Sequence, residues 1–123
     1  MAKRVLIVDD AISMRTQLRE IFTDAGFEVI GEAAHGLDAV SMYDALRPDL
    51  ITMDIVMPYK NGIEATREIL EIDRDAVVLI CSALGQETLV LDAIEAGASD
   101  FILKPFHAGQ VLEAVGKILG IAA

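Results

Sequence analysis

Short apolar runs recur along this chain at regular intervals, and their spacing constrains the fold more than any other feature. They are rich in Val and Ile, and they lie at Val5–Val8, Glu28–Ile30 (the weakest), Leu50–Met53, Val77–Cys81 and Phe101–Leu103. Short runs without alternation are typical of strands buried on both faces. Successive runs are separated by 19, 19, 23 and 19 residues. Each gap has room for one helix and two loops, which is the crossover that parallel strands need.

The segments between the runs carry the apolar spacing of amphipathic helices. The apolar stripes lie at Met14–Ala25, Leu37–Tyr43, Ile63–Leu70, Leu89–Ile94 and Val111–Leu119. Gly26 and Gly97 follow the first and fourth stripes as helix stops. Five strands alternating with five helices predict an α/β domain with a parallel sheet covered on both sides. Because the fifth stripe ends near Leu119, we expect one domain over residues 1–123 with no output domain after it.

The composition narrows the function classes. With 20 acidic and 10 basic residues, the net charge is −10, which disfavours nucleic acids and anionic membranes as partners. The single cysteine, Cys81, excludes an internal disulfide and a Cys-rich zinc site, and we interpret it as a small core residue. His35 and His107 have no ligand at metal-binding spacing and are interpreted as surface residues. No run approaches the ~20 residues of a membrane span, so we expect a soluble cytoplasmic protein.

Polar residues follow the predicted strands at the points where the strands end. Asp9 and Asp10 follow the first run, Asp54 the third, Ser82 the fourth and Lys104 the fifth. The carboxyl ends of parallel strands lie at one edge of the sheet, where open α/β folds bind ligands. We therefore expect three carboxylates, a hydroxyl and an ammonium around one crevice.

Three carboxylates in a small space need compensating charge. Each pair at ~4 Å costs about 4 kcal/mol at an effective dielectric near 20. Lys104 offsets part of this repulsion and a bound cation the rest. Oxygen ligands without His or Cys favour Mg²⁺ or Mn²⁺. Such a crevice is suited to a phosphoryl group, with one aspartate supplying the attacking oxygen.

Each of these residues also has a simpler interpretation. Asp9 and Asp10 are suited to capping the helix that follows them, and Asp54 to capping a loop. Ser82 is suited to capping the fourth helix, and Lys104 to an ordinary solvated charge. It is the convergence of all five at one edge that favours a site.

Taken together, the motifs resemble the receiver domain of two-component response regulators, and most closely its stand-alone chemotaxis type, over essentially the whole chain. The resemblance rests on LIVDD (Asp9, Asp10), TMDIVMP (Asp54), Gly62 after Pro58, ICSALG (Ser82) and FILKP (Phe101, Lys104, Pro105). It implies a flavodoxin-like, doubly wound sheet with strand order 2-1-3-4-5.

The resemblance also implies roles for the site residues. Asp54 is implied to accept a phosphoryl group from a histidine kinase. Asp10, Asp54 and the backbone carbonyl of Val56 are implied to ligate Mg²⁺, for which Mn²⁺ can substitute, while Asp9 acts through metal-bound water. Lys104 is implied to pair with the phosphoryl group. The protein would catalyse its own phosphorylation and dephosphorylation without being an enzyme that turns over a separate substrate.

A switch is implied by the same resemblance. Ser82 would move toward the phosphate and Phe101 would turn inward, a shift in population driven by the new charge. The Lys104–Pro105 bond is expected to be cis, although trans is the general preference. Gly62 is expected to supply a backbone shape that a side chain would forbid. Ser82 and Phe101 stand where receivers often have Thr and Tyr. In receivers, the side chains at the positions of Val56 and Leu84 tune the lifetime of the acyl phosphate, and because both are apolar here the dephosphorylation rate stays open.

The partners implied by the resemblance are a chemotaxis-type histidine kinase, a flagellar motor switch protein and a phosphatase, bound by a monomer. The surface of the fourth helix, fifth strand and fifth helix would meet them, with a contribution from Leu91. A phosphorelay intermediate stays open as an alternative. An aspartate-nucleophile phosphatase places a second Asp where this chain has Val56, and a flavin mononucleotide site would have its phosphate repelled by Asp9 and Asp10. No P-loop motif occurs.

Overall fold

The computed structural model describes residues 2–121 and shows a parallel five-stranded sheet in the order β2-β1-β3-β4-β5. The expected fold class and strand order are thereby confirmed. The strands are β1 (Arg4–Val8), β2 (Glu28–Ala33), β3 (Leu50–Asp54), β4 (Val78–Ser82) and β5 (Asp100–Leu103). The helices are α1 (Ile12–Asp24), α2 (Gly36–Leu46), α3 (Gly62–Ile72), α4 (Glu87–Glu95) and α5 (Ala108–Leu119). None of the described helices is long and apolar enough to cross a bilayer.

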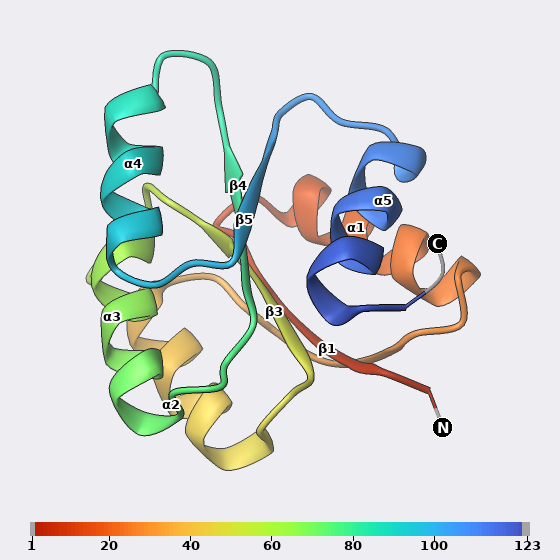
Figure 1. The fold of residues 1–123 in the computed structure, drawn as a ribbon, viewed down its shortest axis with the longest axis horizontal. Helices are drawn as coiled ribbons and strands as arrows, with labels where there is room; N and C mark the ends of the chain where they lie inside the picture. The colour runs from red at the N-terminus through yellow and green to blue at the C-terminus, as the bar shows by residue number, and fades with distance from the viewer. Residues whose placement is uncertain (1, 122–123) are drawn as a thin grey trace.

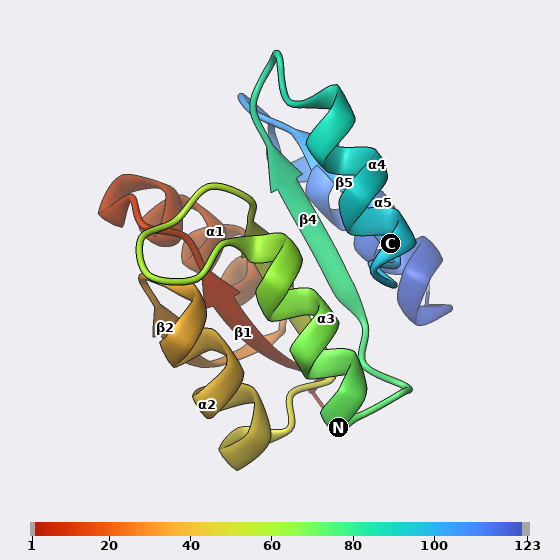
Figure 2. The same cartoon turned by 90° about the vertical axis from the view of Figure 1, so that its left-hand side faces the viewer.

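The helices cover both faces of the sheet. Helices α1 and α5 lie on one face, and α2, α3 and α4 lie side by side on the other (Figures 1 and 2). Successive residues of β1 belong to different cores: Val5 and Ile7 pack toward α1 and α5, whereas Leu6 and Val8 pack toward the opposite helices. This alternation explains why the central strands are continuous apolar runs, since both faces of each strand are buried.

The structure differs from the apolar pattern at an edge strand and in one helix. Strand β2 continues to Ala33, whereas the apolar run ends at Ile30. The apolar pattern misses the end of this strand because an edge strand can carry polar and partly exposed residues. In α2 the buried side chains are Ala39 and Tyr43, one turn apart, and Leu37 is 51% exposed rather than part of the buried stripe. The predicted apolar stripe is therefore wrong at Leu37, which lies on the exposed face of α2.

The two histidines begin helices. The side chain of His35 accepts a hydrogen bond from the backbone N–H of Asp38 at 3.3 Å, and that of His107 accepts from Gln110 at the same distance. The backbone N–H of His107 in turn donates to Gln110 Oε1 at 3.0 Å, which completes a capping box. We expected only surface residues here, and the structure adds a capping role. Cys81 is buried in the sheet, as expected.

Candidate functional site

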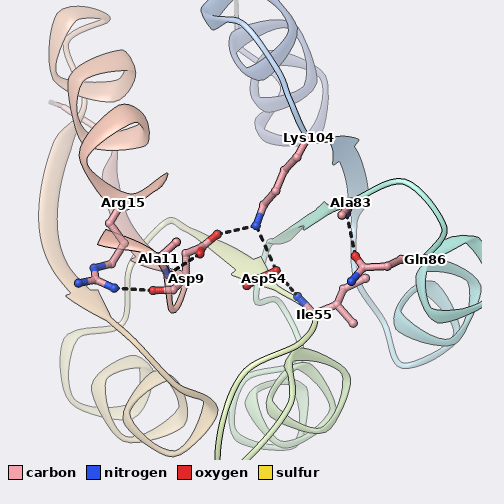
Figure 3. A network of polar contacts seen from close by, with 8 residues as sticks. All are labelled: Asp9, Ala11, Arg15, Asp54, Ile55, Ala83, Gln86 and Lys104. Carbon is pink, nitrogen blue, oxygen red and sulfur yellow. Dashed lines mark hydrogen bonds and ion pairs between the residues drawn. The ribbon is translucent and has the colours of Figure 1, made fainter. Parts of the chain in front are cut away.

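The polar residues that follow the strands meet in one crevice at the carboxyl edge of the sheet. Lys104 Nζ lies 2.8 Å from Asp9 Oδ2 and 3.2 Å from Asp54 Oδ1 (Figure 3). One carboxylate oxygen each of Asp9, Asp10 and Asp54 lies within 4.8 Å of the others. Residues 95 positions apart in the chain are therefore in direct contact.

Strand register explains this meeting. In the sheet, Val8 lies beside Met53, so Asp9 and Asp54 are the next residues on neighbouring strands. Strand β4 pairs with β5 so that Ser82 lies beside Leu103, immediately before Lys104. Parallel pairing of central strands thus delivers the end of each strand to the same level.

Asp9 is held at every polar atom. Its backbone N–H donates to Ala33 O at 3.0 Å, and its carbonyl accepts from Arg15 Nη1 at 2.6 Å. Oδ1 accepts from the Ala11 N–H at 2.9 Å, and Oδ2 receives the ammonium of Lys104. Asp9 is only 1% exposed. The N-cap residue of α1 is Ala11, and this cap has no side-chain hydrogen bond, so neither Asp9 nor Asp10 caps the helix that follows them. The Lys104 bond shows instead that Asp9 belongs to the cluster.

Asp54 is buried with more negative than positive charge around it. Its Oδ1 accepts from the Ile55 N–H at 2.9 Å as well as from Lys104. Burial, the charge of Asp9 and a side-chain bond with Asp10 raise the pKa of Asp54 to about 6, although the charge and hydrogen bond of Lys104 oppose this rise. Burial alone lowers the pKa of Lys104, but its contacts with Asp9 and Asp54 outweigh burial and raise it.

The donor set fits a hard divalent cation. Three carboxylates converge, and no histidine or cysteine belongs to the cluster. Asp10 is exposed, whereas Asp9 and Asp54 are buried, so the cluster has one accessible and two enclosed ligands. The side chain of Val56 is aliphatic, so this residue has only its backbone carbonyl to offer to a cation. Small, hard ions bound by few carboxylates and several waters suit this arrangement.

Ser82 does not cap the fourth helix. It is the last residue of β4, is fully buried, and its hydroxyl has no hydrogen-bond partner among the described residues. The N-cap residue of α4 is Gln86, whose side chain instead accepts from the Ala83 N–H at 2.7 Å (Figure 3). An unpaired buried hydroxyl costs stability, so Ser82 is a donor that lacks an acceptor in this state. Phe101, on edge strand β5, is 41% exposed and faces outward.

Two backbone features support the site. The Lys104–Pro105 bond is cis, as expected. Gly62 lies so close to β3 that a Cβ there would be 2.0 Å from the carbonyl oxygen of Asp54, and its N–H donates to Ile55 O at 2.7 Å. Glycine is required at position 62 by this close approach and not by a positive φ, since Gly62 is not among the positive-φ residues.

Arg15, which contacts the backbone of Asp9, was not predicted as a site residue from the sequence. Its position one turn into α1 was a usable signal, because helical side chains lean toward the N-terminus and hence toward the loop carrying the two aspartates. Its second partner, Glu32 on β2, had no local signal, because that contact forms only when α1 packs against β2.

Comparison with known proteins shows one family throughout. The family model described as "Response regulator receiver domain" matches residues 5–116. "Chemotaxis protein CheY" of Thermotoga maritima is 55% identical over 118 residues, which cover 96% of this chain and 98% of that protein. "Chemotaxis protein CheY" of Bacillus subtilis is 54% identical over 97% of this chain and 99% of that protein. A crystal structure of a CheX–CheY–BeF3–Mg²⁺ complex from Borrelia burgdorferi has a chain that is 42% identical, with a TM-score of 0.90, over 94% of this chain and 88% of that one.

Proposed function

This chain belongs to the response regulator receiver family, and from that premise we propose that it is a phosphorylation switch with Asp54 as the acceptor. The observation that carries this proposal is the contact of Lys104 with both Asp9 and Asp54 inside a cluster of three carboxylates. An ammonium at this place is ready to pair with a phosphoryl oxygen once Asp54 is modified.

In the proposed reaction, a carboxylate oxygen of Asp54 attacks the phosphorus of a phosphohistidine. The O–P bond forms and the P–N bond breaks, with its electron pair returning to the imidazole. Lys104 neutralises a phosphoryl oxygen, and the unpaired hydroxyl of Ser82 gains an acceptor. Mg²⁺, or Mn²⁺ in its place, would be held by Asp10, Asp54, the Val56 carbonyl and, through water, Asp9, and would supply neutralising charge.

The proposed signal leaves through the surface next to Phe101. A groove of about 340 Å³ lies between α4 and β5 and is lined by Glu87, Val90, Leu91, Phe101 and Leu103. Movement of Ser82 toward the phosphate would let Phe101 turn inward and change the shape of this groove. Exposed Leu91, at 66%, gives the groove an apolar contact for a partner.

The proposed partners follow the chemotaxis relatives: a histidine kinase as donor, a flagellar motor switch protein as target and a phosphatase. The Borrelia burgdorferi relative is bound to CheX, which supports a protein partner of some kind. A monomer and a cytoplasmic location stay predictions from the sequence.

Acetyl phosphate with Mg²⁺ tests the acceptor site. The wild-type protein should gain the mass of one phosphoryl group, and Asp54→Asn should gain none. Asp44→Asn, on the exposed face of α2, is the matched control and should label like the wild type. Labelling that persists in Asp54→Asn rejects Asp54 as the acceptor. Phosphotransfer from a panel of kinases then tests the pathway, and a preference for a kinase outside chemotaxis rejects that part of the proposal.

A further inference from the structure

Arg15 bridges the turn that carries the aspartates and the end of β2. Its Nη1 donates to the carbonyl of Asp9 at 2.6 Å, and its Nε donates to Glu32 Oε1 at 3.0 Å (Figure 3 shows the Asp9 contact). The Arg15 side chain is 14% exposed, so the guanidinium is largely enclosed between α1 and β2. A planar guanidinium with several donors is suited to holding two acceptors at once.

Glu32 is in turn held by a second arginine. Its other oxygen, Oε2, accepts from Arg19 Nε at 2.6 Å. Arg19 is 46% exposed and makes no contact with Asp9 among the described residues. Arg15 and Arg19 therefore share a partner and a helix face, but only Arg15 touches the site.

We propose that Arg15 is a positioning residue for the acidic site: by holding the Asp9 carbonyl, it fixes the backbone from which Asp9 and Asp10 reach the cation. The Asp9 carbonyl belongs to the peptide unit that joins these two residues, so its orientation sets where the Asp10 carboxylate starts. This inference rests on the proposed Mg²⁺ site. Outer contacts of this kind typically change metal affinity 10–100-fold.

Charge and positioning predict opposite results for the loss of Arg15. Removing a positive charge near a cation site strengthens cation binding by Coulomb's law. Releasing the Asp9 carbonyl lets the carboxylates leave their places and weakens binding. The sign of the change in Mg²⁺ affinity therefore separates the two effects, and a purely structural role would lower stability without this loss of affinity.

The experiment is calorimetric titration of the folded, unphosphorylated protein with Mg²⁺, comparing the wild type with Arg15→Gln, Arg15→Lys and Arg19→Gln. We expect Kd to rise about tenfold in Arg15→Gln. We expect a several-fold rise in Arg15→Lys, which keeps the charge but loses the two-pronged geometry. Arg19→Gln, the matched control, removes the same charge from the same partner and should stay within about twofold of the wild type or bind slightly more tightly.

Amide hydrogen exchange in the metal-free protein gives an independent readout. The Ala11 N–H, which donates to Asp9 Oδ1, should exchange faster in Arg15→Gln than in Arg19→Gln. Unchanged or tighter Mg²⁺ binding by Arg15→Gln, with Ala11 still protected, overturns the inference. Absence of Mg²⁺ binding by the wild type instead contradicts the proposed metal site, so the two failures are distinguishable.

Discussion

Burial has opposite effects on stability in the middle of the sheet and at its carboxyl edge. In the middle, apolar residues such as Ile51 and Ile80 are fully buried on both faces and stabilise the fold. At the edge, Asp9 and Asp54 are almost as deeply buried and share one ammonium, and the raised pKa of Asp54 means that its ionised form destabilises the fold. The buried apolar interior therefore stabilises the fold, whereas the buried carboxylates at the edge need added positive charge to be stabilised.

The largest expected effect tests the interior. Ile51→Ala removes a buried side chain between β3 and the helices α2 and α3 and should lower the free energy of unfolding by about 2–5 kcal/mol. Urea unfolding followed by circular dichroism measures this loss. The matched control is Ile72→Ala, at the 36% exposed end of α3, which should cost much less. Equal losses at both positions would contradict the placement of the core.

The next effect tests the edge and has the opposite sign. The pKa of Asp54 is raised from 3.8 to about 6, so the folded protein binds a proton at Asp54 more tightly than the unfolded chain does. Ionisation of Asp54 therefore lowers the free energy of unfolding progressively as pH rises from about 4 to about 6, and the whole loss is present above pH 6. In EDTA at pH 7.5, Asp54→Asn should raise the free energy of unfolding by about 3 kcal/mol.

This gain should shrink to a small remainder near pH 4, where Asp54 is protonated in the folded protein and about half protonated in the unfolded chain, whose pKa is 3.8. Mg²⁺ should stabilise the wild type and stabilise Asp54→Asn less. Thermal unfolding at the two pH values, with EDTA or Mg²⁺, measures both differences. A metal-free Asp54→Asn protein that is less stable than the wild type at pH 7.5 would refute the idea that the edge is short of positive charge.

Two buried hydroxyls sharpen the comparison further. The hydroxyls of Thr52 in β3 and of Ser82 at the end of β4 both lack a hydrogen-bond partner within residues 2–121, but only Ser82 lies at the edge. Thr52→Val keeps the shape and removes the unpaired hydroxyl, so it should raise the free energy of unfolding by about 1 kcal/mol without changing labelling by acetyl phosphate. Ser82→Ala should also stabilise the fold, but it should impair labelling or the response of a partner. Equal labelling and partner response in both variants would remove Ser82 from the proposed switch.

The same contrast separates what the sequence reveals from what it conceals. Central strands and site aspartates were predictable because burial on both faces produces continuous apolar runs, and parallel topology brings the residues after those runs to one edge. Strand β2 was only partly visible, because an edge strand carries polar residues such as Glu32. The bridge from Arg15 to Glu32 and the histidine caps were not predictable, because each depends on one side-chain geometry that many sequences satisfy.

The smallest effect concerns a polar contact far from the edge. Tyr43 is buried against α3, and its hydroxyl donates to Asp73 Oδ2 at 2.8 Å. That hydrogen bond, together with one from the Asp75 N–H, lowers the pKa of Asp73. A lowered pKa stabilises the fold at pH values above the unfolded pKa, and this contribution is lost as pH falls through the folded pKa. Tyr43→Phe should therefore cost about 1 kcal/mol at pH 7 and less below pH 4.

Chemical unfolding of the wild type and Tyr43→Phe at the two pH values measures this difference. As a control, Asp44→Asn removes an exposed carboxylate from the same helix and should not change how the cost of Tyr43→Phe depends on pH. A cost that stays the same at both pH values would assign the effect to packing of the ring and not to the charge on Asp73. Unlike Asp54, Asp73 is stabilised in its ionised form by its neighbours. Protonation of Asp73 should therefore lower the free energy of unfolding, whereas protonation of Asp54 should raise it.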